Sequence, residues 1–147
     1  MRRFSVVLFT LCTVASLAGC RKRRAFCPED LTGEWQHADD ATYRFSVKDD
    51  GAALTMHPHR EGGGVAGGPD LLATLVPAAD RLKGSLATTT STPKGRSCPV
   101  TFQWDVVACA PGQMTVRSEQ EYGIQEDCSR FPGEAPDVAD SDLVRVK

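Results

Sequence analysis

Short segments in which apolar and polar residues alternate recur along this chain, and they constrain its fold more than any other feature. Residues Tyr43 to Lys48 alternate strictly, and residues Val100 to Val106 do so again. Because successive side chains of a strand point to opposite faces of a sheet, this period of two predicts half-buried β-strands. No segment after Cys20 shows the period of an amphipathic helix. The sequence therefore predicts an all-β protein.

Turn signals separate the expected strands. Asp50-Gly51 is a strong hairpin signal because glycine accepts the positive φ that such turns require, and Pro111-Gly112 predicts another turn. The glycine-rich stretch 61–69 and the polar stretches 88–97 and 129–141 are predicted to be loops. The eight expected strands span residues 34–37, 43–48, 53–56, 71–76, 81–87, 100–106, 114–122 and 143–146.

Eight amphipathic strands with mostly short connections indicate an antiparallel meander. Every strand has one apolar face to bury, and an open sheet of this width would leave two edges exposed, which closure removes. An eight-stranded barrel is wide enough to be filled by side chains or to hold one small ligand. We therefore expect residues 27–147 to form a single up-and-down β-barrel domain, with a β-sandwich as the alternative.

Four cysteines of this domain, Cys27, Cys98, Cys109 and Cys128, predict two disulfides, because an even number of cysteines in a domain exported to an oxidising compartment is typical of disulfide pairing. A metal site is the alternative, but the spacings match no zinc motif. A strand rises about 3.3 Å per residue, so two cysteines that flank one strand lie beyond the roughly 7 Å that a disulfide spans. Cys98 and Cys109 flank the sixth expected strand, and Cys109 and Cys128 flank the seventh. The remaining pairing joins Cys27 to Cys109 and Cys98 to Cys128.

The first residues have the form of a secretory signal. A basic start is followed by an apolar stretch shorter than the roughly 20 residues that cross a bilayer as a helix. The stretch ends in Leu17-Ala18-Gly19-Cys20, which resembles the lipobox of bacterial lipoproteins. The resemblance implies a signal peptide over 1–19, cleavage before Cys20, and diacylglycerol and palmitate-type acylation of that residue. The alternatives are a plain signal peptide or an uncleaved anchor with a chance cysteine.

The basic cluster Arg21 to Arg24 follows the expected cleavage site, so residues 20–26 are predicted to form a lipidated basic tether. Positive charge here opposes translocation, but after export it would contact anionic headgroups. Arg21 also replaces the aspartate that retains lipoproteins in the inner membrane of enteric bacteria, so analogy favours the outer membrane. All 19 acidic residues of the chain follow this cluster, which argues against a nucleic-acid-binding face.

The segment that enters the first expected strand is Leu31-Thr32-Gly33-Glu34-Trp35. Its Gly-x-Trp resembles the signature of lipocalins, which belong to the calycin group of small barrels. The resemblance implies that Trp35 plugs the closed end of the barrel and that Arg145, on the last strand, lies across it. An arginine over an indole face contributes about 0.5–2 kcal/mol, depending on burial.

No motif of the chain predicts catalysis. His57 and His59, with His37 nearby, are the only metal-ligand candidates, but Pro58 is expected to break their strand and no carboxylate completes a triad. The chain also has no Gly-x-Ser-x-Gly motif, and its paired aspartates lie at turns. We therefore expect no metal, no cofactor and no enzymatic activity.

Four aromatic residues lie on apolar strand faces, where they would line a ligand cavity or fill the core: Tyr43, Phe45, Phe102 and Trp104. We expect a non-enzymatic envelope module with a structural role or a protein partner, because so short a barrel leaves little room inside. The alternative is a lipocalin-like carrier of a small apolar ligand. An interior cavity of about 300 Å³ or more would favour the carrier.

Overall fold

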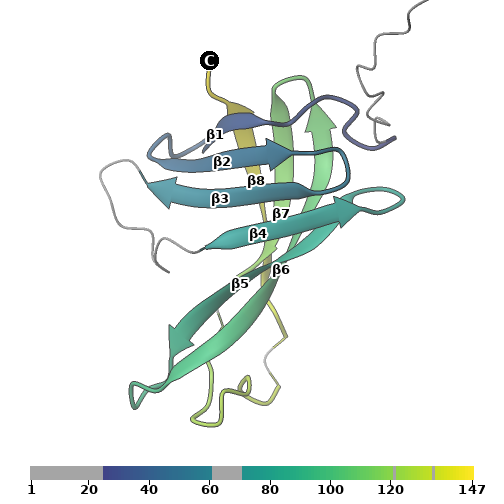
Figure 1. Cartoon of the computed structure of the whole chain (residues 1–147). Coiled ribbons are helices and arrows are strands. Elements are labelled where there is room, and N and C mark those ends of the chain that lie inside the picture. The colour runs from purple at the N-terminus through teal and green to yellow at the C-terminus, as the bar shows by residue number, and fades with distance from the viewer. Residues whose placement is uncertain (1–24, 61–70, 121, 134) are drawn as a thin grey trace, which may run out of the picture.

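A computed structural model describes residues 25–60, 71–120, 122–133 and 135–147 of the chain (Figure 1). The described residues form eight strands. They are β1 (Gly33–His37), β2 (Tyr43–Asp49), β3 (Leu54–Arg60), β4 (Leu72–Pro77), β5 (Leu82–Ser91), β6 (Ser97–Ala110), β7 (Gln113–Glu119) and β8 (Val138–Arg145).

Each strand pairs antiparallel with the next, and β8 pairs with β1, so the sheet closes into a barrel. The predicted all-β class and eight-stranded antiparallel barrel are confirmed, and the sandwich alternative is wrong. The topology is compatible with a lipocalin-like fold. No helix within the described residues is long and apolar enough to cross a membrane.

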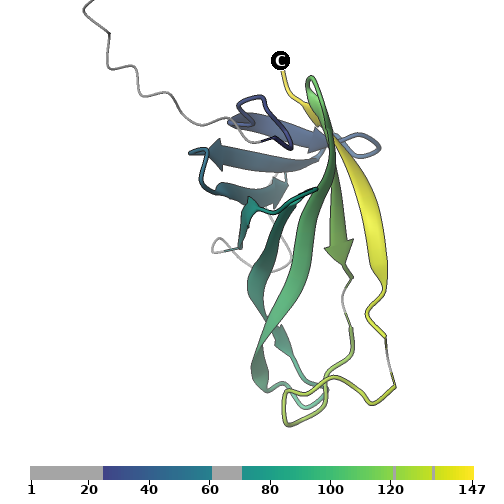
Figure 2. The same ribbon diagram turned by 90° about the vertical axis from the view of Figure 1, so that its right-hand side faces the viewer.

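The meander gives the barrel two different ends. Strand β1 begins, and β8 finishes, at the end that carries the β2–β3, β4–β5 and β6–β7 turns. The β5–β6 hairpin and the segment between β7 and β8 lie at the opposite end, away from the C-terminus (Figures 1 and 2). We call the end with the β2–β3, β4–β5 and β6–β7 turns the closed end, and the end with the β5–β6 hairpin the open end.

Side chains fill the closed end. Trp35 is fully buried, and its indole Nε1 donates a hydrogen bond of 2.9 Å to the carbonyl of Leu31, in the segment before β1. The Leu31 amide in turn donates to the buried carboxylate of Asp49 at 3.1 Å. The segment before β1 therefore covers the closed end. The inward residues that pack there include Leu54, Leu75, Leu82, Val106, Met114 and Leu143.

Strand β3 continues through Pro58, so the prediction that this proline breaks the strand was wrong. The hydrogen bond from Asp50 N to the Ala53 carbonyl sets the alternation of the β2–β3 ladder, and it leaves the nitrogen of Pro58 on the side away from β2. On that side the pairing of β3 with β4 ends at Met56. The missing N–H of proline therefore removes no ladder bond.

Two predicted loops are partly wrong. Strand β5 continues to Ser91 and β6 spans 97–110, so Cys98 and Cys109 lie inside β6 near its two ends. Strand β8 begins at Val138, and its ladder with β7 is supported by side-chain bonds from Arg117 to Asp140 and from Thr115 to Asp142. Strand β7 ends at Glu119, three residues earlier than expected. The predicted glycine-rich loop 61–69 lies outside the described residues.

Gly84, in β5, permits the close approach of β4 and β5. A Cβ atom at this position would lie 2.0 Å from the Thr74 carbonyl oxygen and 2.7 Å from the Leu75 Cα. We predict that Gly84→Ala lowers the free energy of unfolding by about 1–3 kcal/mol or more, because the obstacle is backbone and cannot rotate away. Urea denaturation measures this loss. Ser85→Ala, on the same strand, is the control, and equal losses in the two variants would refute the steric explanation.

Candidate functional site

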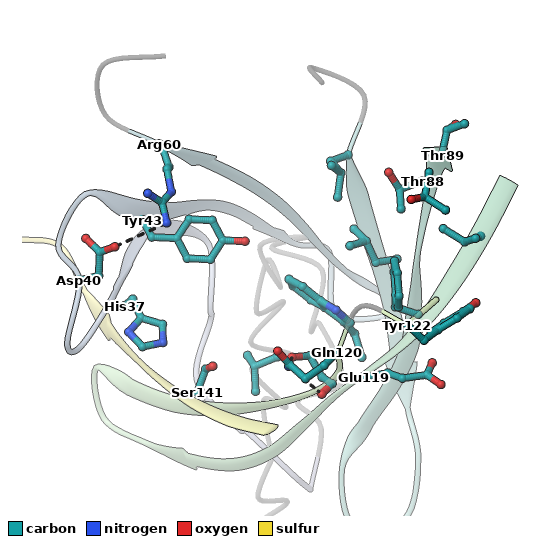
Figure 3. Close-up of a pocket in the computed structure, with 18 residues that line it drawn as sticks. His37, Asp40, Tyr43, Arg60, Thr88, Thr89, Glu119, Gln120, Tyr122 and Ser141 are labelled. Carbon is teal, nitrogen blue, oxygen red and sulfur yellow. Dashed lines mark hydrogen bonds and ion pairs between the residues drawn. The ribbon is translucent and has the colours of Figure 1, made fainter. Parts of the chain in front are cut away.

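A cavity of about 740 Å³ opens inside the barrel at its open end (Figure 3). Seven of the eight strands line it, together with the residues next to them. The lining residues are His37, Asp40, Tyr43, Arg60, Leu71, Leu86, Thr88, Thr89, Thr90, Val100, Phe102, Trp104, Val116, Ser118, Glu119, Gln120, Tyr122 and Ser141. The cavity exceeds the roughly 300 Å³ at which small-molecule sites begin.

The lining divides into an apolar inner part and a polar outer part. Its aliphatic residues and the rings of Phe102 and Trp104 are buried, whereas its other residues, which all carry polar groups, are half-buried or exposed. A molecule that fills this space would therefore meet hydrocarbon and aromatic surface inside and hydrogen-bonding groups at the rim. The buried apolar residues are Leu71, Leu86, Val100, Phe102, Trp104 and Val116.

One side of the rim carries Arg60, Asp40 and Tyr43. The Arg60 guanidinium lies 5.5 Å from the centroid of the Tyr43 ring, and its Nη2 lies 3.8 Å from an Asp40 carboxylate oxygen. A hydrogen bond from the Thr42 hydroxyl lowers the pKa of Asp40, and a second bond from the Thr42 backbone amide lowers it further. Burial raises the pKa of Tyr43, whose hydroxyl points toward the middle of the cavity (Figure 3). Tyr43 is therefore a neutral hydrogen-bonding group at neutral pH.

The other side of the rim is held by an ion pair between Glu119 and Arg130. The Glu119 side chain is only 6% exposed, and it also accepts a 3.0 Å hydrogen bond from the Gln103 amide. Burial raises the pKa of Glu119, but the bonds from Gln103 and Arg130 outweigh it and leave the pKa below its ordinary value. Arg130 lies over the Tyr122 ring at 3.5 Å, and Tyr122 packs edge-on against Phe102.

Residues 122–130, which carry Tyr122 and Arg130, are fastened to the tip of the β5–β6 hairpin. The Cys98–Cys128 disulfide joins the two, with Cα atoms 5.5 Å apart. Glu126 accepts hydrogen bonds from the Thr92 hydroxyl at 3.0 Å and from the Lys94 amide at 3.1 Å. These bonds fix the outer wall of the cavity.

The four aromatic residues predicted as ligand-binding candidates lie together on this side of the core. Tyr43, Phe102 and Trp104 line the cavity, whereas Phe45 does not. The Phe45 ring lies behind the lining, 5.0 Å from the Tyr43 ring and 6.0 Å from the Trp104 ring, and it supports both. Tyr122 is a fifth aromatic residue of this group.

The predicted plug residues lie at the closed end. Trp35 and Arg145 are direct partners in the β1–β8 ladder, and the guanidinium lies 4.9 Å from the indole centroid. Arg145 also donates a hydrogen bond to the carbonyl of Asp30. The second disulfide, Cys27–Cys109, ties the segment before β1 to the end of β6. Both disulfides therefore have the predicted pairing.

The three histidines are not brought together. His37 lines the cavity, whereas His57 and His59 lie on β3. His59 contacts Glu34 at 3.1 Å and Ser46 at 3.3 Å, both through Nε2. A catalytic triad uses one ring nitrogen for each partner, so this surface cluster has a different arrangement. Within the described ranges, no group of three or more histidine, cysteine or acidic side chains is placed to hold a metal ion.

Sequence reasoning missed the polar part of the lining. Thr88, Thr89 and Ser141 lie in stretches predicted to be loops, and Glu119 carried no motif. The one usable signal was the disulfide pairing, since it places Cys98 and Cys128 at the same end and so indicates which segments form that rim.

Comparison with known proteins finds no family model that matches this chain, and no curated protein or solved structure that matches it. The geometry of the barrel and its cavity is therefore the basis on which a function is assigned.

Acidification is predicted to remove the contribution of Glu119 to stability. The pKa of Glu119 in the folded protein lies below its ordinary value in an unfolded chain. Ionised Glu119 therefore contributes its full stabilisation when the pH is above that ordinary value, and this stabilisation is lost as the pH falls through the folded-state pKa. Glu119→Gln should lower the free energy of unfolding by about 1–3 kcal/mol at pH 7, with a smaller difference from wild type below about pH 4. Asp140→Asn, in an exposed pair, is the control and should cost less. Urea denaturation across pH tests this, and a pH-independent difference would contradict it.

Removal of the Cys98–Cys128 bridge is predicted to loosen the cavity wall. Cys98→Ala with Cys128→Ala should reduce stability by about 2–4 kcal/mol and speed amide exchange in residues 122–131. Cys27→Ala with Cys109→Ala should also destabilise the fold but leave local exchange at the open end unchanged. Hydrogen-exchange mass spectrometry distinguishes the two, and equal exchange at the open end in both variants would show that the bridge does not hold this wall.

Proposed function

We propose that this protein is a lipid-anchored envelope lipoprotein whose barrel binds a small amphipathic molecule. The observation that carries the binding proposal is the cavity of about 740 Å³. Its volume exceeds the roughly 300 Å³ expected of a small-molecule site, which favours a carrier over an interaction module with a filled barrel. The polar rim also changes the expected ligand, from a purely apolar molecule to one with an apolar part and a hydrogen-bonding part.

The envelope location is supported by independent features. Residues Leu17 to Cys20 have the lipobox pattern, although they lie outside the described residues. The two disulfides suit an oxidising compartment such as the periplasm. One acyl chain holds a protein only marginally, whereas two or three hold it effectively permanently. Attachment to the outer membrane rather than the inner one rests on the analogy drawn from Arg21.

An interaction module with a protein partner is the second candidate. Strand β4 presents Leu72 and Val76 on the outer face of the barrel, 44% and 52% exposed. They are separated by Thr74 on the same face of the strand, and an exposed apolar pair of this kind is compatible with a contact surface. The cavity has no role in that function, so a bound ligand distinguishes the two.

Ligand binding is tested first on protein purified from its own membranes. Native mass spectrometry is expected to show a retained small molecule. Titration with a fluorescent dansyl fatty acid should show saturable binding that quenches Trp104. Ser141→Phe, which places a ring in the cavity, should weaken binding at least about tenfold through lost volume. Thr101→Phe, on the exposed outer face of β6, is the control. Equal binding by both variants would contradict the cavity as the site.

Lipidation is tested by the mass of the N-terminal peptide. The expected product begins at Cys20 and carries a diacylglycerol thioether, and Cys20→Ser should leave the protein unacylated and released from membranes. A native product that still begins at Met1, or that lacks lipid on Cys20, would overturn the lipoprotein assignment.

A further inference from the structure

The chain enters the barrel at the closed end. The segment before β1 lies across that end, where Leu31 accepts the hydrogen bond of Trp35 and Cys27 is bonded to Cys109. These contacts fix the position of Cys27, so the point from which the tether leaves the folded domain cannot move toward the cavity. Any anchor on Cys20 therefore acts on the closed end.

The mouth of the cavity lies at the other end. Cys98 and Cys109 lie near the two ends of β6, and 11 residues of strand, at about 3.3 Å each, separate them by roughly 35 Å. Cys98 is bonded to Cys128 in the wall of the cavity, whereas Cys109 is bonded to Cys27. The tether exit and the cavity rim are therefore about 35 Å apart along the barrel wall.

The tether is too short to span this separation. Seven residues lead from Cys20 to Cys27, and a fully extended chain advances at most about 3.6 Å per residue, so the tether reaches about 25 Å. The strands of such a barrel tilt about 35–45° from its axis, so the length of β6 between Cys98 and Cys109 corresponds to a height of roughly 25–29 Å. Residues 92–96 of the hairpin extend beyond Cys98 and add to this height. A barrel turned with its mouth onto the bilayer would therefore hold Cys27 farther from the headgroups than a fully extended tether reaches.

We propose that the cavity opens away from the membrane that holds the lipid anchor and exchanges its ligand with the aqueous phase, not directly with that leaflet. This inference rests on the proposed lipidation of Cys20. Lys94 and Arg96 are exposed at the tip of the β5–β6 hairpin, whereas Phe131 and Val138, also at the open end, are 41% and 56% exposed. The inference therefore rests on the length of the tether and not on the surface chemistry of the mouth.

The experiment measures which end of the barrel lies near the membrane. Full-length protein with lipid on Cys20 is inserted into phosphatidylethanolamine–phosphatidylglycerol vesicles that contain a headgroup acceptor dye. A donor dye is placed at Lys147→Cys, near the closed end, or at Lys94→Cys, at the mouth, since both lysines are exposed. The other cysteines are bonded or acylated, so each variant has one reactive thiol.

Energy transfer from position 147 should be at least about twofold more efficient than transfer from position 94, given the roughly 25–29 Å or more that separates the two ends along the barrel axis. Equal transfer, or stronger transfer from position 94, would overturn the inference. Insertion of about 20 glycine and serine residues after Arg24 lets the barrel turn, so the difference should shrink. An unchanged difference would show that tether length does not set the orientation.

The same vesicles separate this inference from the proposed function. The dansyl fatty acid used for binding is added to the anchored protein with each donor site left unlabelled. Failure of the probe to bind would overturn the carrier function and leave the measured orientation intact. Binding with position 94 nearest the bilayer would retain the carrier and overturn the orientation.

Discussion

The antiparallel pairing of β1 with β8 is the contact on which the rest of this structure depends. Only three residue pairs form this ladder, yet they turn an open meander into a closed barrel. The same ladder sets Trp35 directly beside Arg145, so the two residues that plug the closed end lie on the two strands whose pairing closes the sheet. The backbone carbonyls of Leu31 and Asp30 then bind these two side chains from the segment before β1. The same two residues therefore take part both in closing the sheet and in covering the closed end of the barrel.

Closure at one end leaves the interior unequal along its length. On β7 the inward residues run from Met114 through Val116 to Ser118, and on β8 they run from Leu143 to Ser141. Large side chains therefore fill the closed end, and smaller polar ones border the open end. Inward side chains become smaller toward the open end, and this decrease in volume produces the cavity. The hydroxyl groups of the small residues provide its polar rim.

The same gradient explains what sequence could and could not predict. Alternation is strong where inward residues are large, as in Tyr43 to Lys48, and there the strands, the barrel and the disulfide pairing follow from pattern and spacing. Alternation disappears where inward residues are small, so the stretches 88–91 and 138–141 were interpreted as loops. The cavity was expected only as the alternative for the same reason, because the hydroxyl residues that line it have no hydrophobic pattern. Glu119 was missed because its partner Arg130 lies beyond an irregular segment.

The position of Pro58 has a consequence for how the barrel behaves in a crowded compartment. Among the described residues, the ladder between β3 and β4 ends at Met56, and β3 beyond it pairs with β2. A strand edge that carries N–H groups is a template onto which another chain adds a strand, and such addition begins aggregation. Pro58 has no N–H on the side of β3 that faces away from β2, so an incoming strand would find one hydrogen bond fewer there. The proline therefore lowers the tendency of this part of β3 to pair with another chain.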